Sequence, residues 1–166
     1  LSDDYVTRLA EACAEKRIGA VVGANFALGA VLMMHMARIA ARYFDAAEII
    51  ELHHPDKVDA PSGTAITTAR LMVEARGKPF GRNVPSATPV PGARDATIDG
   101  VTLHSVRLPG LVAHQEVIFG GVGQTLTIRH DTTGRESFMP GVLLAVREVM
   151  QRHELIVGLD RLIGLV

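Results

Sequence analysis

Residues 48–65 read Glu-Ile-Ile-Glu-Leu-His-His-Pro-Asp-Lys-Val-Asp-Ala-Pro-Ser-Gly-Thr-Ala, and this stretch decides the fold. Glu48 to Leu52 predicts a short buried strand, and Thr64 to Ala75 predicts a helix. A strand that runs into a polar loop and then into a helix N-terminus places reactive side chains at the strand's carboxyl end, where open α/β folds bind ligands. The stretch therefore predicts a site that protonates a small, negatively charged substrate.

The same alternation of strands and helices continues on both sides of this stretch. Upstream, the pattern predicts a helix over 2–17, a strand over 18–22, a turn over 23–26 and a helix over 27–44. Downstream it predicts a long irregular segment over 77–100, strands over 101–108, 114–120 and 124–130, a hairpin at 120–123 and a helix over 138–152. We expect an α/β fold with a mixed open sheet of about four main strands flanked by helices.

The composition limits the class of protein. A chain of 166 residues is long enough for one sizeable core, and its net charge of −1 gives no electrostatic basis for binding nucleic acid or an anionic membrane. The single cysteine, Cys13, argues against a disulfide framework or a thiolate metal site and favours a reducing, cytoplasmic setting. We find no signal peptide and no apolar run that would span a bilayer. Because the chain opens with Leu1 rather than Met, we expect a piece of something longer.

Two histidines and a lysine lie in the polar loop. Adjacent strand residues point to opposite faces, so only one of His53 and His54 faces a common substrate unless Pro55 ends the strand and the turn brings both rings together. Histidine is suited to proton transfer near neutral pH. The alternative is one buried, hydrogen-bonded histidine and one surface histidine. Lys57 is either an ordinary surface lysine or a group that holds a substrate carboxylate or polarises a C=N bond.

The start of the following helix is a candidate anion site. Backbone N–H groups at a helix start carry partial positive charge, and Gly63 allows a ligand to approach the backbone closely. The hydroxyl of Thr64 adds a hydrogen-bond donor, whereas Ser62 is equally explained as an ordinary N-cap. A metal site of both histidines with Asp59 is weaker, because no second helix offers the usual paired-ligand spacing. We expect Asp59 to cap or brace the loop, and we predict no metal.

A second candidate contact lies upstream, where Gly23, Ala24, Asn25 and Phe26 form a turn between a strand and a helix. Such a turn in a parallel sheet is placed to contact a nucleotide cofactor, although it is equally explained as a tight turn with Phe26 in the core. The sequence contains no Gly-x-Gly-x-x-Gly phosphate-binding motif. Arg135 and Phe138 form a further, weaker candidate pair.

The run from His53 to Ala65 resembles the signature of the 4-hydroxy-tetrahydrodipicolinate reductase family, formerly called dihydrodipicolinate reductase, of bacterial lysine and diaminopimelate biosynthesis. The likeness covers essentially the whole chain and looks closest to actinobacterial members. The supporting segments are Gly-Ala-Asn-Phe-Ala-Leu-Gly at 23–29, Leu-Pro-Gly-Leu-Val-Ala-His-Gln-Glu-Val at 108–117, Ile-Arg-His-Asp at 128–131 and Ser-Phe-Met-Pro-Gly-Val at 137–142.

The resemblance implies a domain organisation. The family has an N-terminal Rossmann domain with a Gly-rich phosphate loop, which this sequence lacks. Residues 1–25 are then the last helix and strand of that domain, 26–155 the substrate-binding and tetramerisation domain, and 156–166 a tail that returns toward the Rossmann domain. We expect this chain alone to be inactive, and the sheet to assemble a homotetramer.

The resemblance also implies roles for individual residues. His53 corresponds to the family's proton donor and Lys57 to its second catalytic group. In the family, NADH or NADPH reduces a cyclic dicarboxylate to tetrahydrodipicolinate. The alternative is a non-catalytic dicarboxylate-binding and oligomerisation module. The implied substrate-binding residues are His54, Ser62, Gly63 and Thr64, and the implied cofactor contacts are Gly23, Ala24, Asn25 and Phe26.

Overall fold

The stretch at 48–65 folds as a strand, a loop and a helix, as its sequence predicts. A computed structural model describes residues 2–81, 89–94 and 96–165. Strand β2 covers Ala46–His53 and helix α3 covers Gly63–Arg76. Burial alternates along β2, because successive side chains of a strand point to opposite faces. The buried side chains, Ala47, Ile49 and Glu51, all lie on one face. Glycine ends the helix, since Gly77 follows it in the left-handed conformation with φ +74°.

Strand β2 is the centre of a five-stranded mixed sheet with the order β3-β4-β2-β5-β6. It is parallel to β4 (Val101–Arg107) and antiparallel to β5 (Ala113–Gly121), which pairs with β6 (Gln124–Thr132). The predicted mixed sheet with four main strands is confirmed, and so is the hairpin between β5 and β6, where Gly123 has φ +71°. The two-residue β3 (Thr97–Ile98) is an addition inside the segment predicted to be irregular; residues 82–88 and 95 of that segment lie outside the described residues.

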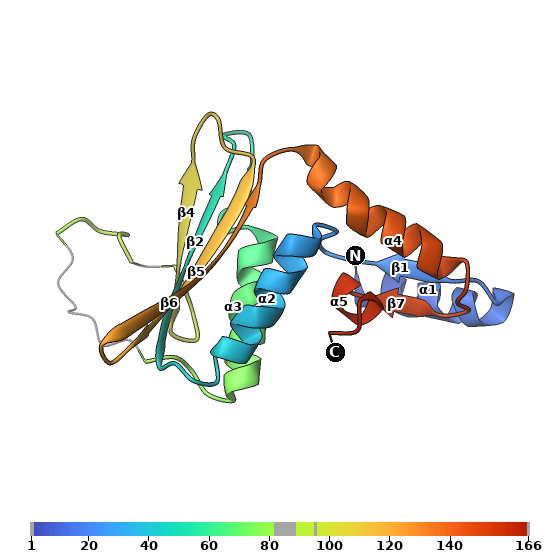
Figure 1. Cartoon of the computed structure of the whole chain (residues 1–166), viewed down its shortest axis with the longest axis horizontal. Coiled ribbons are helices and arrows are strands. Elements are labelled where there is room, and N and C mark those ends of the chain that lie inside the picture. Colours follow the sequence, from blue (N-terminus) through green and yellow to red (C-terminus); the bar gives the residue numbers. More distant parts are fainter. Residues whose placement is uncertain (1, 82–88, 95, 166) are drawn as a thin grey trace. The chain divides into compact units, whose positions relative to one another are not determined.

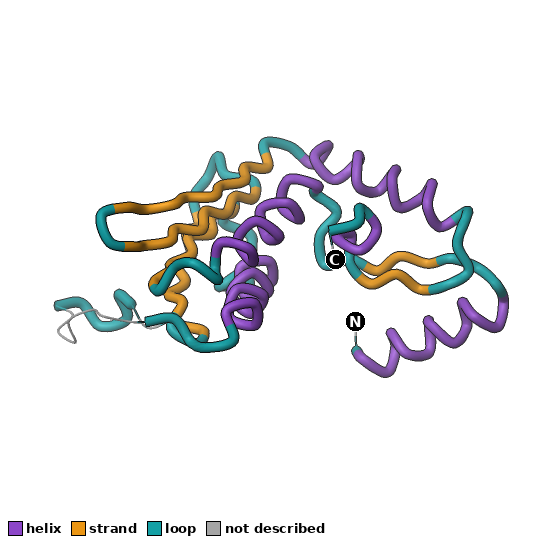
Figure 2. Tube along the Cα trace, turned by 60° about the horizontal axis from the view of Figure 1, so that its bottom comes forward, coloured by secondary structure: helices purple, strands orange, loops and turns teal. Residues whose placement is uncertain are grey.

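Helices α2 (Leu28–Ala40) and α3 lie against one face of this sheet (Figures 1 and 2). Alanines on both helices permit a close approach to the strands, and each fully buried Ile, Met or Phe stabilises the fold by roughly 1.5–3 kcal/mol. Helix α2 ends before the predicted residue 44. The backbone N–H groups of Arg42 and Tyr43 donate to carbonyl oxygens only three residues earlier, those of Ile39 and Ala40, so the α-helical pattern stops there. The core includes Met33, Ala37, Ala41, Ile49, Ala65, Ala69, Met72, Val117 and Phe119.

No helix of the unit Leu32–Gly134 lies on the opposite face of the sheet in the part of that unit that the structure describes (Figure 1). Strand β2 contributes half-buried Ile50 and Leu52 to this face, because they alternate with the buried Ile49 and Glu51. Ion pairs join neighbouring strands across the same face. They are Glu48–His104, Glu116–Arg129, His114–Asp131 and, within β6, Arg129–Asp131.

The chain divides into two compact units. The first unit is Leu32–Gly134 and contains the five-stranded sheet, and the second is formed by Leu1–Val31 together with Arg135–Val166. The second contains α1 (Asp3–Lys16), β1 (Ala20–Val22), the 3₁₀ turn η1 (Arg135–Phe138), α4 (Met139–Val149), β7 (Leu155–Val157) and α5 (Leu159–Leu162). Strands β1 and β7 pair in parallel. These units are defined by packing alone, and the functional boundaries expected at residues 25 and 155 stay a prediction.

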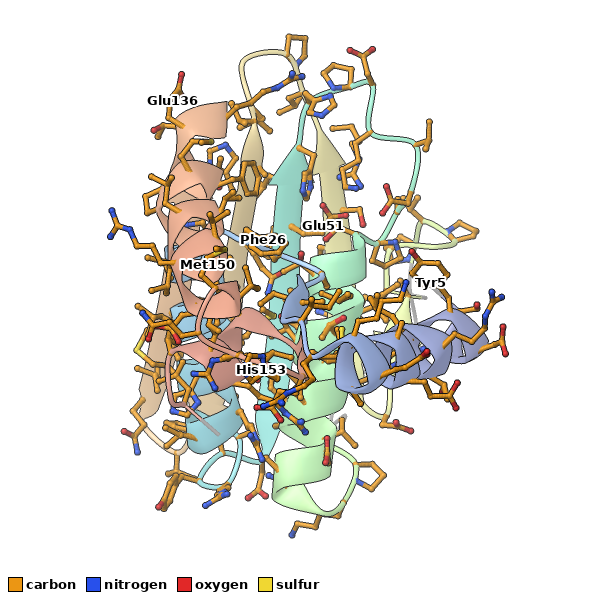
Figure 3. The ribbon with its side chains drawn as sticks, turned by 90° about the vertical axis from the view of Figure 1, so that its right-hand side faces the viewer. Tyr5, Phe26, Glu51, Glu136, Met150 and His153 are labelled. Carbon is orange, nitrogen blue, oxygen red and sulfur yellow. The ribbon has the colours of Figure 1, made fainter. Side chains whose placement is uncertain are left out.

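Close backbone contact fixes helix α4 inside its unit. A Cβ at Gly141 would come within 2.0 Å of the Phe26 carbonyl oxygen, and a Cβ at Gly19 within 2.4 Å of the Val149 carbonyl oxygen. Only glycine fits these positions without a shift of the backbone. Figure 3 labels Phe26 and Met150 in this unit. No helix in the described part of the chain is long and apolar enough to cross a membrane.

Candidate active site

A buried carboxylate organises the carboxyl end of β2. The side chain of Glu51 is fully buried, although it is charged. In the four residues before it, the buried side chains, Ala47 and Ile49, are apolar. Its Oε1 accepts a hydrogen bond from the backbone N–H of Ser62 at 3.2 Å, and this contact joins the strand to the start of α3. Figure 3 shows Glu51 where β2 meets the first turn of that helix. The carboxylate therefore fixes the strand, the loop and the helix start relative to one another.

Hydrogen bonds keep Glu51 ionised in spite of its burial. Burial acts to raise the pKa of this carboxyl, but hydrogen bonds from Arg107, Ser105 and His53 outweigh it and hold the pKa below the ordinary value of 4.5. A buried carboxylate without such donors would take up a proton instead. Glu51 is therefore a fixed negative charge that can only accept hydrogen bonds.

Arg107 uses all of its five N–H donors. It lies beside His53 in the parallel register of β2 and β4, and its two terminal nitrogens donate to the two oxygens of Glu51 at 2.8 and 2.9 Å. Its other donors reach backbone carbonyl oxygens: Nε that of Lys57 at 3.3 Å, and the terminal nitrogens those of Val106 at 2.7 Å and Asp59 at 2.6 Å. One guanidinium thus joins the buried carboxylate to the loop that carries Lys57.

His53 is the last residue of β2 and is directed toward Glu51. Its Nδ1 lies 2.5 Å from Glu51 Oε2, and 12% of its side chain is exposed. Burial is the largest influence on the imidazole and lowers its pKa below 6.5, with smaller contributions from the cations Lys57 and Arg107; the bond to Glu51 offsets part of this. His53 is therefore mostly neutral at pH 7, with Nε2 on the side of the ring away from Glu51.

A carboxylate from the loop occupies the expected anion-binding groups. Lys57 Nζ donates to Asp59 Oδ1 at 2.5 Å, and the backbone N–H groups of Asp59 itself and of Gly63 lie close enough to the same carboxylate to lower its pKa. The hydrogen bond from Lys57 is the main reason that the pKa of Asp59 lies below 3.8. We call the Lys57 ammonium and the Gly63 N–H the carboxylate cradle. Both groups lie beside the carboxylate of Asp59, which braces the loop as its sequence predicted, and their binding of an anionic ligand stays a prediction.

The start of α3 is built to remain open at Gly63. Ser62 is buried and its Oγ accepts from the N–H of Ala65 at 3.2 Å, so Ser62 is the N-cap that its sequence also allowed. A Cβ at Gly63 would meet nothing within 4 Å. Thr64 is half-buried beside it, and its carbonyl accepts from the Thr68 hydroxyl at 2.8 Å. Neither packing nor backbone strain in this chain requires glycine at residue 63.

The structure brings His53, Lys57 and the start of α3 together at one end of the sheet, whereas His54 is exposed in the loop. Their roles stay a prediction. In the other unit, Asn25 Oδ1 accepts from the N–H of Ala27 at 2.8 Å and closes a turn just before α2, Ala24 is exposed, and Phe26 is half-buried. Arg135 is exposed and Phe138 half-buried in η1, and the cofactor contacts expected of both segments stay predictions too.

Two residues of the site were missed by sequence reasoning, namely Glu51 and Arg107. A signal for Glu51 was present, because a charged residue two positions before a histidine on an apolar strand shares its face. Arg107 gave no such signal, since its contact depends on the register of two parallel strands. Among the described residues, no group of three or more His, Cys, Asp or Glu side chains could hold a metal ion.

Comparison with known proteins agrees with the resemblance found in the sequence. The family model described as the C-terminus of dihydrodipicolinate reductase matches residues 29–163. A 4-hydroxy-tetrahydrodipicolinate reductase from Moorella thermoacetica is 55% identical over 163 residues, which are 98% of this chain and 61% of that protein. One from Mycobacterium ulcerans is 58% identical over 145 residues, 87% of this chain and 59% of that protein.

A solved structure is similar as well. The dipicolinate-bound dihydrodipicolinate reductase from Paenisporosarcina sp. TG-14 matches with a TM-score of 0.85 and 46% identity. The match covers 97% of this chain and 61% of that chain. The chain thus spans about three fifths of the length of the relatives that it matches.

Proposed function

Because the chain belongs to the dihydrodipicolinate reductase family, we propose that it forms the substrate-binding part of a 4-hydroxy-tetrahydrodipicolinate reductase. The proposed reaction is the NAD(P)H-dependent reduction of 4-hydroxy-tetrahydrodipicolinate or dihydrodipicolinate to tetrahydrodipicolinate. It belongs to lysine and diaminopimelate biosynthesis in the cytoplasm. The names of the relatives and the dipicolinate bound to the similar structure support this assignment.

The observation that carries the proposal is the carboxylate cradle itself. Lys57 donates to the Asp59 carboxylate, and the Gly63 N–H lies close enough to lower the pKa of that carboxylate. A substrate carboxylate that replaces Asp59 meets the same ammonium and the same backbone N–H. His54 follows His53 in the sequence, and Thr64 follows Gly63. Both are proposed to contact the remainder of a cyclic dicarboxylate. Ser62 contributes by capping the helix.

His53 is the proposed proton donor. In the free chain burial keeps the pKa of this imidazole low, so it is mostly neutral at pH 7. A dicarboxylate bound beside it favours the imidazolium, because an opposite charge within a few ångströms raises the pKa of a histidine. The ring then carries a proton on Nε2, away from Glu51, and gives it to the carbon skeleton of the substrate as reduction proceeds.

The residues 23–26 fit a contact with one edge of a nicotinamide cofactor rather than with its phosphates. The turn follows the carboxyl end of β1, the usual position for a nucleotide contact, and it offers exposed Ala24 and the ring of Phe26. Its packing is close, because a Cβ at Gly23 would lie 3.4 Å from that ring. When bound, NADH or NADPH supplies the hydride. Arg135 and Phe138 are proposed as further contacts.

We further propose that the sheet assembles a homotetramer. The face of β2 that carries Ile50 and Leu52 is not covered by a described helix of its own unit, and its charged groups are paired with each other across the strands. A half-buried apolar surface with compensated charges suits burial against a second copy. Light scattering of the full-length protein tests this assembly.

Titration calorimetry with dipicolinate tests the proposed site directly. We expect the wild-type chain to bind, and Lys57→Gln to weaken binding about tenfold or more, because it removes a charged hydrogen-bond donor. Lys78→Gln is the matched control: Lys78 is exposed just after α3 and interacts with Asp45. Equal affinities for Lys57→Gln and the wild type would reject the cradle.

A kinetic measurement separates the enzyme from the non-catalytic alternative. In the full-length protein, we expect NAD(P)H oxidation with freshly generated substrate, and a much lower maximal rate for His53→Gln with a smaller change in affinity. A protein that binds dipicolinate but never oxidises NAD(P)H would be the binding and oligomerisation module instead.

A further inference from the structure

We propose that Glu51 and Arg107 are positioning residues for His53. Glu51 fixes the hydrogen of the neutral ring on Nδ1 and leaves Nε2 for the substrate side, and Arg107 couples this pair to the loop that carries Lys57. The catalytic meaning of the arrangement rests on the proposed function, but the arrangement itself is testable without turnover.

The chemistry of the two side chains determines the tautomer. Glu51 Oε2 lies 2.5 Å from His53 Nδ1, and an ionised carboxylate has no hydrogen to give. Nδ1 must therefore be the donor in every protonation state of the ring. The second nitrogen, Nε2, is then the only one whose proton is gained and lost. A ring with its hydrogen on Nε2 alone would place two acceptors against each other.

Arg107 supplies what Glu51 needs in order to remain ionised in a buried position. Its bidentate contact compensates the carboxylate, and three other donors hold backbone oxygens, two of which belong to Lys57 and Asp59. A lysine at residue 107 would keep the charge but not the planar fork. The same guanidinium therefore sets the position of the proton donor and that of the carboxylate cradle.

The charged groups that face His53 come from three elements. Glu51 lies on its own strand, Arg107 on β4 and Lys57 in the loop, whereas the neighbour on β5 is the uncharged Ala113. Both cations disfavour the imidazolium and only Glu51 favours it. Neutralising Glu51 leaves both cations unopposed, so the proton affinity of His53 must fall.

The opposite face of the same strand provides a matched control. Glu48 Oε2 lies 2.7 Å from His104 Nε2, which is also a carboxylate–histidine contact between β2 and its surroundings. That glutamate side chain is 44% exposed, compared with 0% for Glu51. Glu48→Gln therefore makes the same chemical change on the same strand without touching the buried network.

The first measurement requires no substitution at Glu51 or Arg107. Nitrogen-15 NMR of the full chain, with the His53 signals assigned by their loss in His53→Gln, gives the tautomer of the neutral ring. We expect the hydrogen on Nδ1. A neutral His53 that carries its hydrogen on Nε2 would overturn the role of Glu51.

The second measurement is the pKa of His53 in variants. We expect Glu51→Gln to lower it by about one pH unit or more, Glu51→Asp to restore part of the loss, and Glu48→Gln to leave it unchanged. No change in Glu51→Gln, or an equal change in Glu48→Gln, would refute the inference. If Glu51→Gln fails to fold, the wild-type tautomer and the Glu51→Asp titration still decide the matter.

The coupling through Arg107 has its own readout. We expect Arg107→Lys to retain the Nδ1–H tautomer but to weaken dipicolinate binding about tenfold, because the loop loses two anchors. Unchanged affinity would remove Arg107 from the proposal. A wild-type chain that binds no dipicolinate would instead refute the proposed function, and the tautomer result would stand independently of it.

Discussion

The open position at the start of α3 gives the sharpest prediction for the site. Gly63 is exposed in the first turn, it has no left-handed backbone conformation, and an added Cβ would meet nothing within 4 Å. Glycine in a helix costs roughly 0.5–1 kcal/mol relative to alanine, part of it through the freedom of the unfolded chain. We therefore expect Gly63→Ala to leave the free energy of unfolding unchanged or to raise it by up to about 1 kcal/mol.

The same methyl group is expected to harm ligand binding. The Asp59 carboxylate lies more than 4 Å from the position of this Cβ, so the methyl group is expected to meet the part of dipicolinate that extends past the Asp59 position and to displace its carboxylate from the Gly63 N–H. Losing a hydrogen bond to a charged group costs about 1.5–3 kcal/mol, which corresponds to a 10- to 150-fold higher Kd for dipicolinate. Stability and affinity should thus change in opposite directions.

The other end of α3 supplies the control for this pair of measurements. Gly77 has φ +74°, so Gly77→Ala should destabilise the fold by about 1–2 kcal/mol and leave dipicolinate affinity unchanged. Urea denaturation and titration calorimetry measure both quantities for both variants. The reasoning is refuted if Gly63→Ala binds dipicolinate as tightly as the wild type, or if it unfolds as readily as Gly77→Ala.

Four further outcomes are expected. Thr64→Val should weaken dipicolinate binding by about 1–3 kcal/mol, and calorimetry giving equal affinities would exclude a contact with its hydroxyl. Asp59→Asn should lower the Kd, because Lys57 no longer holds an internal carboxylate; a higher Kd would mean that Asp59 supports the bound state. Dipicolinate binding should take up a proton at His53, whose pKa is below 6.5 in the free chain, so affinity should fall as pH rises; calorimetry in buffers of different ionisation enthalpy detects this, and no proton uptake would contradict it. The pKa of Glu51 is lowered in the folded state, so its contribution to stability is present above pH 4.5 and lost as pH falls through the folded value; urea midpoints should fall less steeply with acid in Glu51→Gln, and identical slopes would disagree.

The sequence predicted the main elements because their patterns are local. The alternation in β2 and the capping residues of α3 lie within a few positions of each other. Strand β3 has only two residues and exists through its pairing with β4, so no periodicity revealed it. Helix α2 was predicted to reach Phe44, but that ring packs on Phe119 at a centroid distance of 5.5 Å, and its carbonyl accepts a hydrogen bond from Arg76. Such contacts join distant parts of the chain.

The candidate site follows the same division between local and distant contacts. His53, Lys57 and Gly63 were singled out because one short stretch contains them all. Arg107 remained hidden because 56 positions separate it from Glu51, and only the parallel pairing of β2 with β4 brings them together. The loop therefore revealed its own chemistry but not the group that holds it in place.

The pairing of Asp59 with the carboxylate cradle turns ligand entry into a competition. The rival is tethered to the same short loop, so its local concentration is far above that of any dissolved monocarboxylate or simple anion. A ligand with a single carboxylate replaces the contact of Lys57 with Asp59 by an equivalent contact, so its binding gains little free energy. A ligand with a second arm profits from the contacts that the tethered residue never makes. The contact between Lys57 and Asp59 thus favours binding of diacids over abundant metabolites with one acid group.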